Sequence, residues 1–132
     1  MLGEKIVEEK GKVTARRVIE THPQTKVETS FEAKGTILGL EHQTIGTYWS
    51  IIQANGLMYG EGNGIAITKE GIASWKGSGV GRFNERGGIS YRGALYFQTT
   101  IERLVRLNSV AAIFEYDTDA NDNTTAQIFE WK

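Results

Sequence analysis

Charged side chains inside apolar, β-forming stretches are the first candidates for chemistry in this sequence. Glu61, Glu115 and Glu130 each lie in such a stretch, where burying a charge is unfavourable unless the charge is paired. Arg92 is the expected internal partner, because a guanidinium group can bind a carboxylate through two hydrogen bonds. Both a structural ion pair and a catalytic carboxylate fit this pattern, and the structural pair is the more common of the two.

Aromatic side chains in the same stretches offer the walls of a binding site. An apolar pocket with a few polar anchors is the usual form of a small-molecule site. Such rings also fill the cores of small barrels, because each ring buries a large area. The candidate ligand-binding residues are Tyr48, Glu61, Asn63, Trp75, Arg92 and Tyr96. No catalytic residue is assigned.

Few residues are candidates for other common kinds of catalytic or metal site. The chain has no cysteine, and its two histidines, His22 and His42, lie beside predicted turns, where a solvated side chain is expected. Histidine is too scarce for a catalytic triad. The run from Asp117 to Asp122 begins like a calcium loop, but Asp122 stands at its glycine position and Ile128 at its glutamate position. We therefore expect a solvated hairpin turn there, no metal site and no cofactor.

Composition narrows the class of protein further. The 132 residues are expected to form a single domain, residues 1–132, with one hydrophobic core. Fifteen basic and sixteen acidic residues nearly balance, so no net field favours nucleic acid as a partner. The first ten residues lack the apolar segment of a signal peptide, and no apolar run is long enough for a membrane span. We expect a cytoplasmic protein with no membrane partner.

Strand periodicity alternates with turn signals along the whole chain. The clearest strand starts at Lys26, with Val27, Thr29 and Phe31 on one face, and Asn55-Gly56 is a strong hairpin signal. The predicted strands cover residues 11–21, 26–37, 43–54, 57–68, 72–83, 89–99, 109–116 and 124–131, and a helical turn over 101–108 is expected to close one end. Eight strands joined mainly by short turns favour an all-β, antiparallel meander barrel, since closure removes exposed edges. A two-sheet β-sandwich is the alternative.

Two runs of alternating glycines are the unusual feature of the sequence. Gly60, Gly62 and Gly64 are followed by Gly77, Gly79 and Gly81, and each set lies on one face of a strand. A turn at Glu70-Gly71 would pair Gly64 with Gly77. The bare patch that results permits sharp bending of a narrow barrel, or leaves room for a ligand, an aromatic ring or a second subunit.

These glycines and their aromatic neighbours carry a family resemblance. The stretch from Gly46-Thr47-Tyr48 through both glycine runs and Trp75 to Tyr91-Arg92-Gly93 resembles small bacterial proteins of unknown function with an allene oxide cyclase-like barrel. The resemblance spans about residues 25–132. It implies an eight-stranded barrel with a cavity and self-association, but no established activity.

Three functions remain open on the sequence. The first is a barrel that binds a small apolar molecule. The second is a cyclase- or isomerase-like enzyme that acts on an apolar substrate by shaping its conformation. The third is a homo-oligomeric interaction protein whose glycine patch packs against a second subunit.

Overall fold

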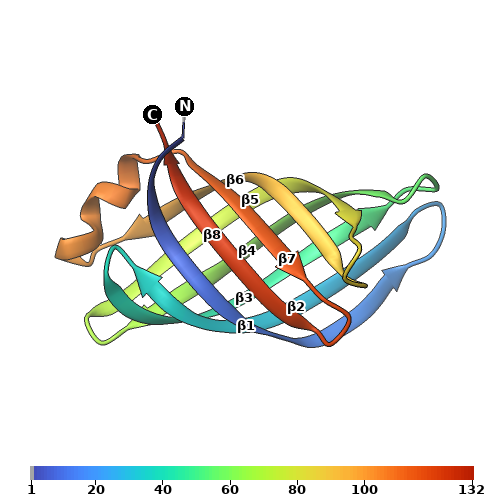
Figure 1. Cartoon of the computed structure of the whole chain (residues 1–132), viewed down its shortest axis with the longest axis horizontal. Coiled ribbons are helices and arrows are strands. Elements are labelled where there is room, and N and C mark those ends of the chain that lie inside the picture. The colour runs from blue at the N-terminus through green and yellow to red at the C-terminus, as the bar shows by residue number, and fades with distance from the viewer. Residues whose placement is uncertain (1) are drawn as a thin grey trace.

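The computed structural model describes residues 2–132 as a closed antiparallel barrel with one short helix at its end (Figure 1). The elements are β1 (Leu2–Glu20), β2 (Thr25–Ile37), β3 (Leu40–Ile52), β4 (Leu57–Thr68), β5 (Gly71–Phe83), β6 (Ile89–Thr99), the 3₁₀ helix η1 (Glu102–Ser109), β7 (Ala112–Thr118) and β8 (Asn123–Trp131). No helix in this described part of the chain is long and apolar enough to cross a membrane.

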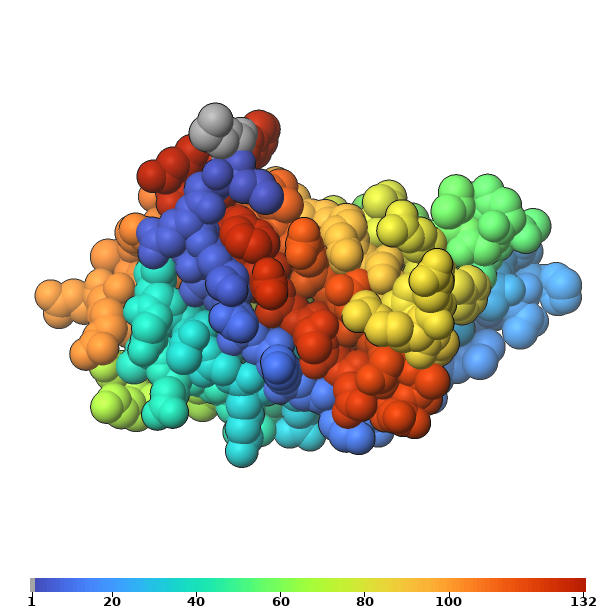
Figure 2. Space-filling view, viewed as in Figure 1, coloured from blue at the N-terminus to red at the C-terminus, as the bar shows by residue number. Residues whose placement is uncertain are grey.

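Pairing between the first and last strands closes the barrel. Each strand pairs with the next along the chain, and β8 returns to β1, with Val7 opposite Ile128 and Lys12 opposite Asn123. The two strands run side by side across one face of the molecule (Figure 2). The meander barrel predicted from the sequence is therefore confirmed, and the two-sheet sandwich is excluded.

Alternation along each strand separates the interior from the surface. In β2, Phe31, Ala33 and Ile37 are buried, whereas Glu32 and Lys34 are exposed. Successive side chains of a strand point to opposite faces, so one face of β2 lines the barrel and the other meets water.

The helix η1 covers one end of the barrel. Leu104 and Leu107 are fully buried, and with Ile101 they pack on interior residues that include Ile37 and Ala73. Figure 1 shows this helix across the mouth of the barrel opposite the loops between β3 and β4 and between β1 and β2. The expectation that a helical turn closes one end is confirmed.

The turn between β4 and β5 differs from the predicted one. Thr68 pairs with Gly71, so the turn is Lys69-Glu70, and the Thr68 hydroxyl binds both the Glu70 amide and the Gly71 carbonyl. Gly62 consequently lies opposite Gly77, and the predicted Gly64–Gly77 pairing is wrong by two residues. Because a shift of two residues preserves the face, the glycines still share one side of the sheet.

That side is the interior, and aromatic rings occupy most of it. A Cβ atom on Gly64 would lie 2.5 Å from the Trp75 ring, one on Gly79 would lie 3.0 Å from Phe114, and one on Gly81 would lie 2.8 Å from Tyr91. The glycines leave room for rings that lie against the inner wall. The glycine patch therefore cannot serve as the expected contact with a second subunit, and homo-oligomerisation stays a prediction without an assigned surface.

Replacing Gly64 by alanine tests this packing. The new Cβ would meet the Trp75 ring and the Ile45 carbonyl at 2.7 Å or less, and overpacking of this kind destabilises a core by about 1–3 kcal/mol. The outward neighbour supplies the control, because Asn63→Ala on the exposed face should change stability by less than about 0.5 kcal/mol. Urea unfolding of both variants gives the comparison, and equal midpoints would contradict the packing.

Candidate functional site

A buried carboxylate lies on the inner face of β1. Glu9 is 7% exposed, whereas its neighbours Glu8 and Lys10 face solvent. It pairs with Gly35 on β2 and with Ala126 on β8, two residues with little or no side chain. A carboxylate in such a place requires partners, because transfer of an unpaired charge from water is strongly unfavourable.

Two side chains from β3 supply those partners. His42 Nε2 lies 2.7 Å from Glu9 Oε2, and the Thr44 hydroxyl donates to the same oxygen over 2.8 Å. The His42 side chain is fully buried and Thr44 is 2% exposed. The expectation that His42 is a solvated turn residue is therefore wrong.

Gly35 allows this contact across an intervening strand. It pairs with Glu9 on one side and with His42 on the other, so it lies between them in the sheet. A Cβ atom here would lie 1.8 Å from the Glu8 carbonyl oxygen and 2.7 Å from the Glu9 Cα. Only glycine fits, and without its side chain the imidazole reaches over β2 to the carboxylate.

The hydrogen bonds determine which imidazole nitrogen carries a proton. Glu9 Oε2 accepts from Thr44, and a carboxylate oxygen can accept a second hydrogen bond from His42 Nε2–H. In the neutral imidazole this leaves Nδ1 with its lone pair. Nδ1 has no hydrogen-bond partner in the described part of the chain. A buried nitrogen without a partner is uncommon in native proteins, and the packing around the ring leaves Nδ1 almost no accessible surface.

An aromatic cluster lies beside this polar cluster. The Phe31 and Tyr116 ring centroids are 5.3 Å apart, and the Tyr48 ring packs edge-on against Tyr116 at 5.5 Å and Tyr91 at 5.8 Å. Trp75 packs against Phe31 at 6.3 Å. These separations are typical of stabilising aromatic pairs.

The tyrosine hydroxyls are hydrogen bonded inside the barrel. Tyr48 donates to Tyr116 over 3.2 Å, and Tyr91 donates to the Ser50 hydroxyl. Burial raises the pKa of Tyr48, Tyr91 and Tyr116 above the ordinary value, and for Tyr116 the neighbouring Tyr48 and Glu9 add to the rise. All three remain neutral hydroxyls at physiological pH.

A cavity of about 80 Å³ lies between the polar and aromatic clusters. Glu9, His42 and Thr44 line it, as do Tyr48 and Tyr116. The further lining residues are mainly apolar or glycine and include Gly60, Gly62, Trp75, Gly77, Gly79, Leu95, Phe97, Phe114, Ala126 and Ile128. Because a cavity of about 150 Å³ holds one benzene molecule, the space suits a ligand of only a few heavy atoms.

An ion pair lies at the end of the barrel away from η1. The β1 ladder shifts register between Val13 and Ala15, and the bulge turns Arg16 to the same side as its partner Thr29, which is buried. Bulges at barrel rims commonly redirect a side chain in this way. Arg16 contacts Asp122 of the β7–β8 turn over 2.8 Å, and the Asp122 hydrogen bond raises the pKa of Arg16.

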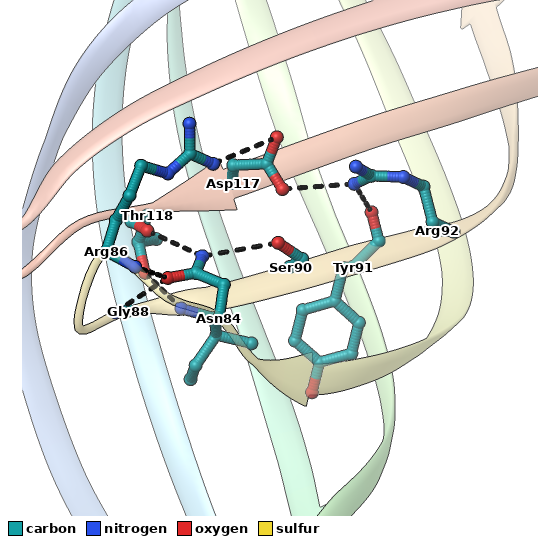
Figure 3. Close-up of polar contacts among 9 residues, drawn as sticks. Asn84, Arg86, Gly88, Ser90, Tyr91, Arg92, Asp117 and Thr118 are labelled. Atoms are coloured by element: carbon teal, nitrogen blue, oxygen red, sulfur yellow. Dashed lines mark hydrogen bonds and ion pairs between the residues drawn. The ribbon is translucent and has the colours of Figure 1, made fainter.

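A second polar network joins the loops at this rim. Figure 3 shows Arg86 and Arg92 approaching Asp117 from opposite sides, while the Tyr91 ring points away from the network. The Arg92–Asp117 distance is 3.1 Å and the Arg86–Asp117 distance is 3.6 Å. Partial burial alone would raise the pKa of Asp117, but hydrogen bonds from Ser90 and Arg92 and the two positive charges lower it.

Asn84 completes that network. Its amide nitrogen donates to Ser90 and to the Thr118 carbonyl, and its side-chain oxygen accepts from the Arg86 and Gly88 amides (Figure 3). The loop between β5 and β6 also accepts a bond from Ala120, so it is tied to the β7–β8 turn. This network fixes the rim of the barrel.

The structure brings together only part of the predicted ligand site. Tyr48, Glu61 and Trp75 are among the residues that line the interior cavity. Glu61, Asn63 and Tyr96 are exposed on β4 and β6, where together with Tyr48 they line a separate hollow at the surface. Glu61 accepts a hydrogen bond from the Tyr59 hydroxyl over 2.7 Å. Arg92 is also on the outer surface and pairs with Asp117, so the expected internal pairing with a glutamate is wrong.

Comparison with known proteins supports the fold alone. No family model and no curated protein matches the sequence. The conserved protein of unknown function RPA1785 from Rhodopseudomonas palustris has a TM-score of 0.82 at 13% identity, covering 98% of this chain and 97% of that one. The β-barrel-like protein ABAYE2633 from Acinetobacter baumannii has a TM-score of 0.83 at 12% identity over 100% and 96%. An enzyme from Penicillium herquei has a TM-score of 0.67 at 15% identity over 96% and 92%.

Removal of the buried carboxylate should destabilise the barrel. Glu9→Ala leaves His42 Nε2 and the Thr44 hydroxyl without their common acceptor, and breaking a buried pair in this way costs about 3–5 kcal/mol. Glu8→Ala, one residue away on the exposed face, should cost less than about 1 kcal/mol, as for other surface ion pairs. Denaturant unfolding compares the two variants, and a similar loss for both would contradict the buried cluster.

The buried tyrosines predict a loss of stability in alkali. Their pKa values are raised in the folded state, so the unfolded chain alone ionises above about pH 10. Below that pH the three tyrosines make their full contribution to the free energy of unfolding, and this contribution falls as the pH rises further. Tyr116→Phe should make the fall shallower by up to about 1.4 kcal/mol per pH unit. Urea unfolding across this pH range measures the slope, and identical slopes would contradict the burial of Tyr116.

Proposed function

We propose that this protein binds a small, largely apolar molecule inside its barrel. The observation that carries the proposal is the interior cavity, whose lining is almost wholly apolar and consists mainly of aromatic rings, aliphatic side chains and glycines. A ligand with an apolar body would contact the rings and the glycine wall.

The size of the cavity limits the ligand. An apolar cavity of about 150 Å³ holds benzene, and the space here is about 80 Å³. The ligand is therefore smaller than benzene, unless the wall moves as it binds. The allene oxide cyclase-like resemblance, which implies a barrel with a cavity, agrees with this proposal at the level of fold.

A cyclase- or isomerase-like enzyme is the second candidate. The contact between Glu9 and His42 favours it, because a carboxylate that orients an imidazole is a common arrangement in general acid–base catalysis. The barrel likeness to an enzyme from Penicillium herquei is compatible with this candidate but carries no residue role.

Xenon is a direct probe of the proposed site, because it binds dry apolar cavities without needing polar contacts. We expect saturable NMR shifts at methyl groups of Leu95 and Ile128, which line the cavity. Ala126→Leu should fill the space and weaken xenon binding by about tenfold or more, equivalent to at least about 1.4 kcal/mol.

Two further variants control for changes in the fold. Thr125→Leu places the same side chain on the exposed face of β8 and should leave xenon binding intact. Ala126→Val is the milder substitution, to be used where leucine disturbs the barrel. Absence of saturable shifts in the unmodified protein would overturn the proposed site.

A further inference from the structure

The outer side of β3 to β6 exposes an unusual number of apolar side chains. These four strands lie opposite the closing pair of β1 and β8 (Figure 1). The β3–β6 face comprises the outward side chains within residues 43–51, 59–67, 72–80 and 92–98. Six large apolar side chains on this face are more than one third exposed: Ile45, Tyr59, Ile67, Ile72, Val80 and Tyr96. Extended apolar patches of this kind mark interaction sites on soluble proteins.

Charge is also sparse on this face. Along the neighbouring strand β2, every outward residue from 26 to 34 is charged except Ser30. On the β3–β6 face the charged residues are Glu61, Lys76 and Arg92. Depletion of charge distinguishes the core of a protein–protein interface from ordinary surface. The β3–β6 face therefore has the composition of an interface.

The centre of the face is hollow. Two depressions of the surface share Thr47, Asn63, Lys76 and Tyr96, so they form one continuous hollow across the four strands. Glycines of β3, β4 and β5 form part of its floor. Tyr96 stands at its edge and is 60% exposed. Aromatic side chains that enter a pocket of the partner commonly supply most of the binding energy of an interface.

Two opposite charges lie next to the centre of the hollow. Lys76 pairs with Asn63 and Glu61 pairs with Ser78, so the two charged residues are diagonal neighbours on adjacent strands. Lys76 forms no ion pair with another residue of the described chain, residues 2–132. A two-fold axis midway between Glu61 and Lys76 would place the lysine of each copy opposite the glutamate of the other, because a two-fold interface brings the same patch of both copies together. The charges of the face are thus complementary to themselves.

We propose that two copies of this chain form a two-fold symmetric dimer through the β3–β6 face. The proposal assigns a surface to the predicted self-association and does not depend on the interior ligand. The axis that pairs Lys76 with Glu61 also brings Ile65 opposite Val80 of the second copy, which gives an apolar contact beside the ion pairs.

The shapes of the side chains suit this arrangement. On the same axis Tyr96 lies opposite Trp49 of the second copy, and Asn63 lies opposite Ser78. The long rings are therefore at the sides of the contact, on β3 and β6, and the short side chains are at its centre, on β4 and β5. Two outwardly curved sheets approach most closely at the centre of their contact, so this distribution lets both the centre and the sides touch.

The face has the size that a stable dimer requires. Strands lie about 4.8 Å apart and outward residues about 6.7 Å apart along a strand, so four strands with about five outward positions each cover about 650 Å². A specific interface buries about 800 Å² on each partner. Projecting side chains such as Tyr96 expose more area than the plane of the sheet, which brings the two values together.

Sedimentation velocity of the intact protein tests the dimer. We expect a species of twice the 14.6 kDa of the chain at micromolar concentration. Tyr96→Ala should raise the dissociation constant of the dimer by about tenfold or more, because it removes the exposed ring at the edge of the hollow. Trp131→Ala removes a ring that is equally exposed but lies outside the face, and should leave the dissociation constant unchanged.

Reversed charges test the two-fold pairing. Glu61→Lys and Lys76→Glu each place like charges opposite one another, so each variant alone should be monomeric. A mixture of the two variants should recover a dimer, because both lysines of one copy then meet glutamates of the other. Lys10→Glu reverses an exposed charge on β1 and should dimerise like the unmodified protein.

Three results would count against the proposal. A monomer at submillimolar concentration, or a trimer, would overturn the dimer and leave the hollow to a different occupant. Dimers that persist in Tyr96→Ala and in both charge variants would show that the copies meet through another surface. Failure of the mixture to recover a dimer would exclude the two-fold pairing of Glu61 with Lys76. Circular dichroism establishes that each variant is folded.

Discussion

The interior of a closed eight-stranded barrel is too narrow to hold a large side chain from every strand, and this limit shapes the rest of the molecule. Large rings from β2, β3, β5, β6 and β7 occupy the interior. The facing positions on β4 and β5 are therefore glycines, with Gly60, Gly62 and Gly64 on one strand and Gly77, Gly79 and Gly81 on the other. The bare wall and the aromatic cluster are two aspects of one packing solution.

The same limit explains how a charge is accommodated inside. The wall beside Glu9 consists of Gly35 and Ala126, which leaves the space that His42 and Thr44 need to reach the carboxylate. Two apolar clusters lie on either side, one below η1 and one among the tyrosines. The polar cluster is therefore enclosed along the barrel axis as well as around it.

Much of the fold could be predicted from the sequence, because its main signals are local. Alternation in β2, the turn at Asn55-Gly56 and the helical spacing after Ile101 each report on neighbouring residues, and each was confirmed. The predicted pairing of β4 with β5 was wrong by two residues. It matched glycines with glycines and did not consider the Thr68 side chain, which determines the turn.

The candidate site was largely missed, because it depends on contacts between distant segments. Glu9 lies in the charged run from Glu4 to Lys12, which hides its inward position, and the first strand was expected to begin only at Gly11. His42 follows a turn and has the appearance of a surface residue. One signal of the buried cluster was present in the sequence, because Gly35 alternates with the apolar residues Ala33 and Ile37 on the inward face of β2. A glycine at such a position leaves space for a side chain from a neighbouring strand.

The closed wall of the barrel also limits the rate at which a small molecule could enter the interior. The helix η1 covers one end and the Arg16–Asp122 pair with the tyrosines narrows the other. The shortest ladder in the ring joins β6 to β7, from Ser90–Asp117 to Leu95–Ala112, and Leu95 and Phe114 of these strands line the cavity. Separation of this seam breaks the fewest interstrand hydrogen bonds, so local opening there would set both the association rate and the residence time of a guest. The barrel would then act kinetically as a slow trap, in which the rate of wall opening matters more than diffusion.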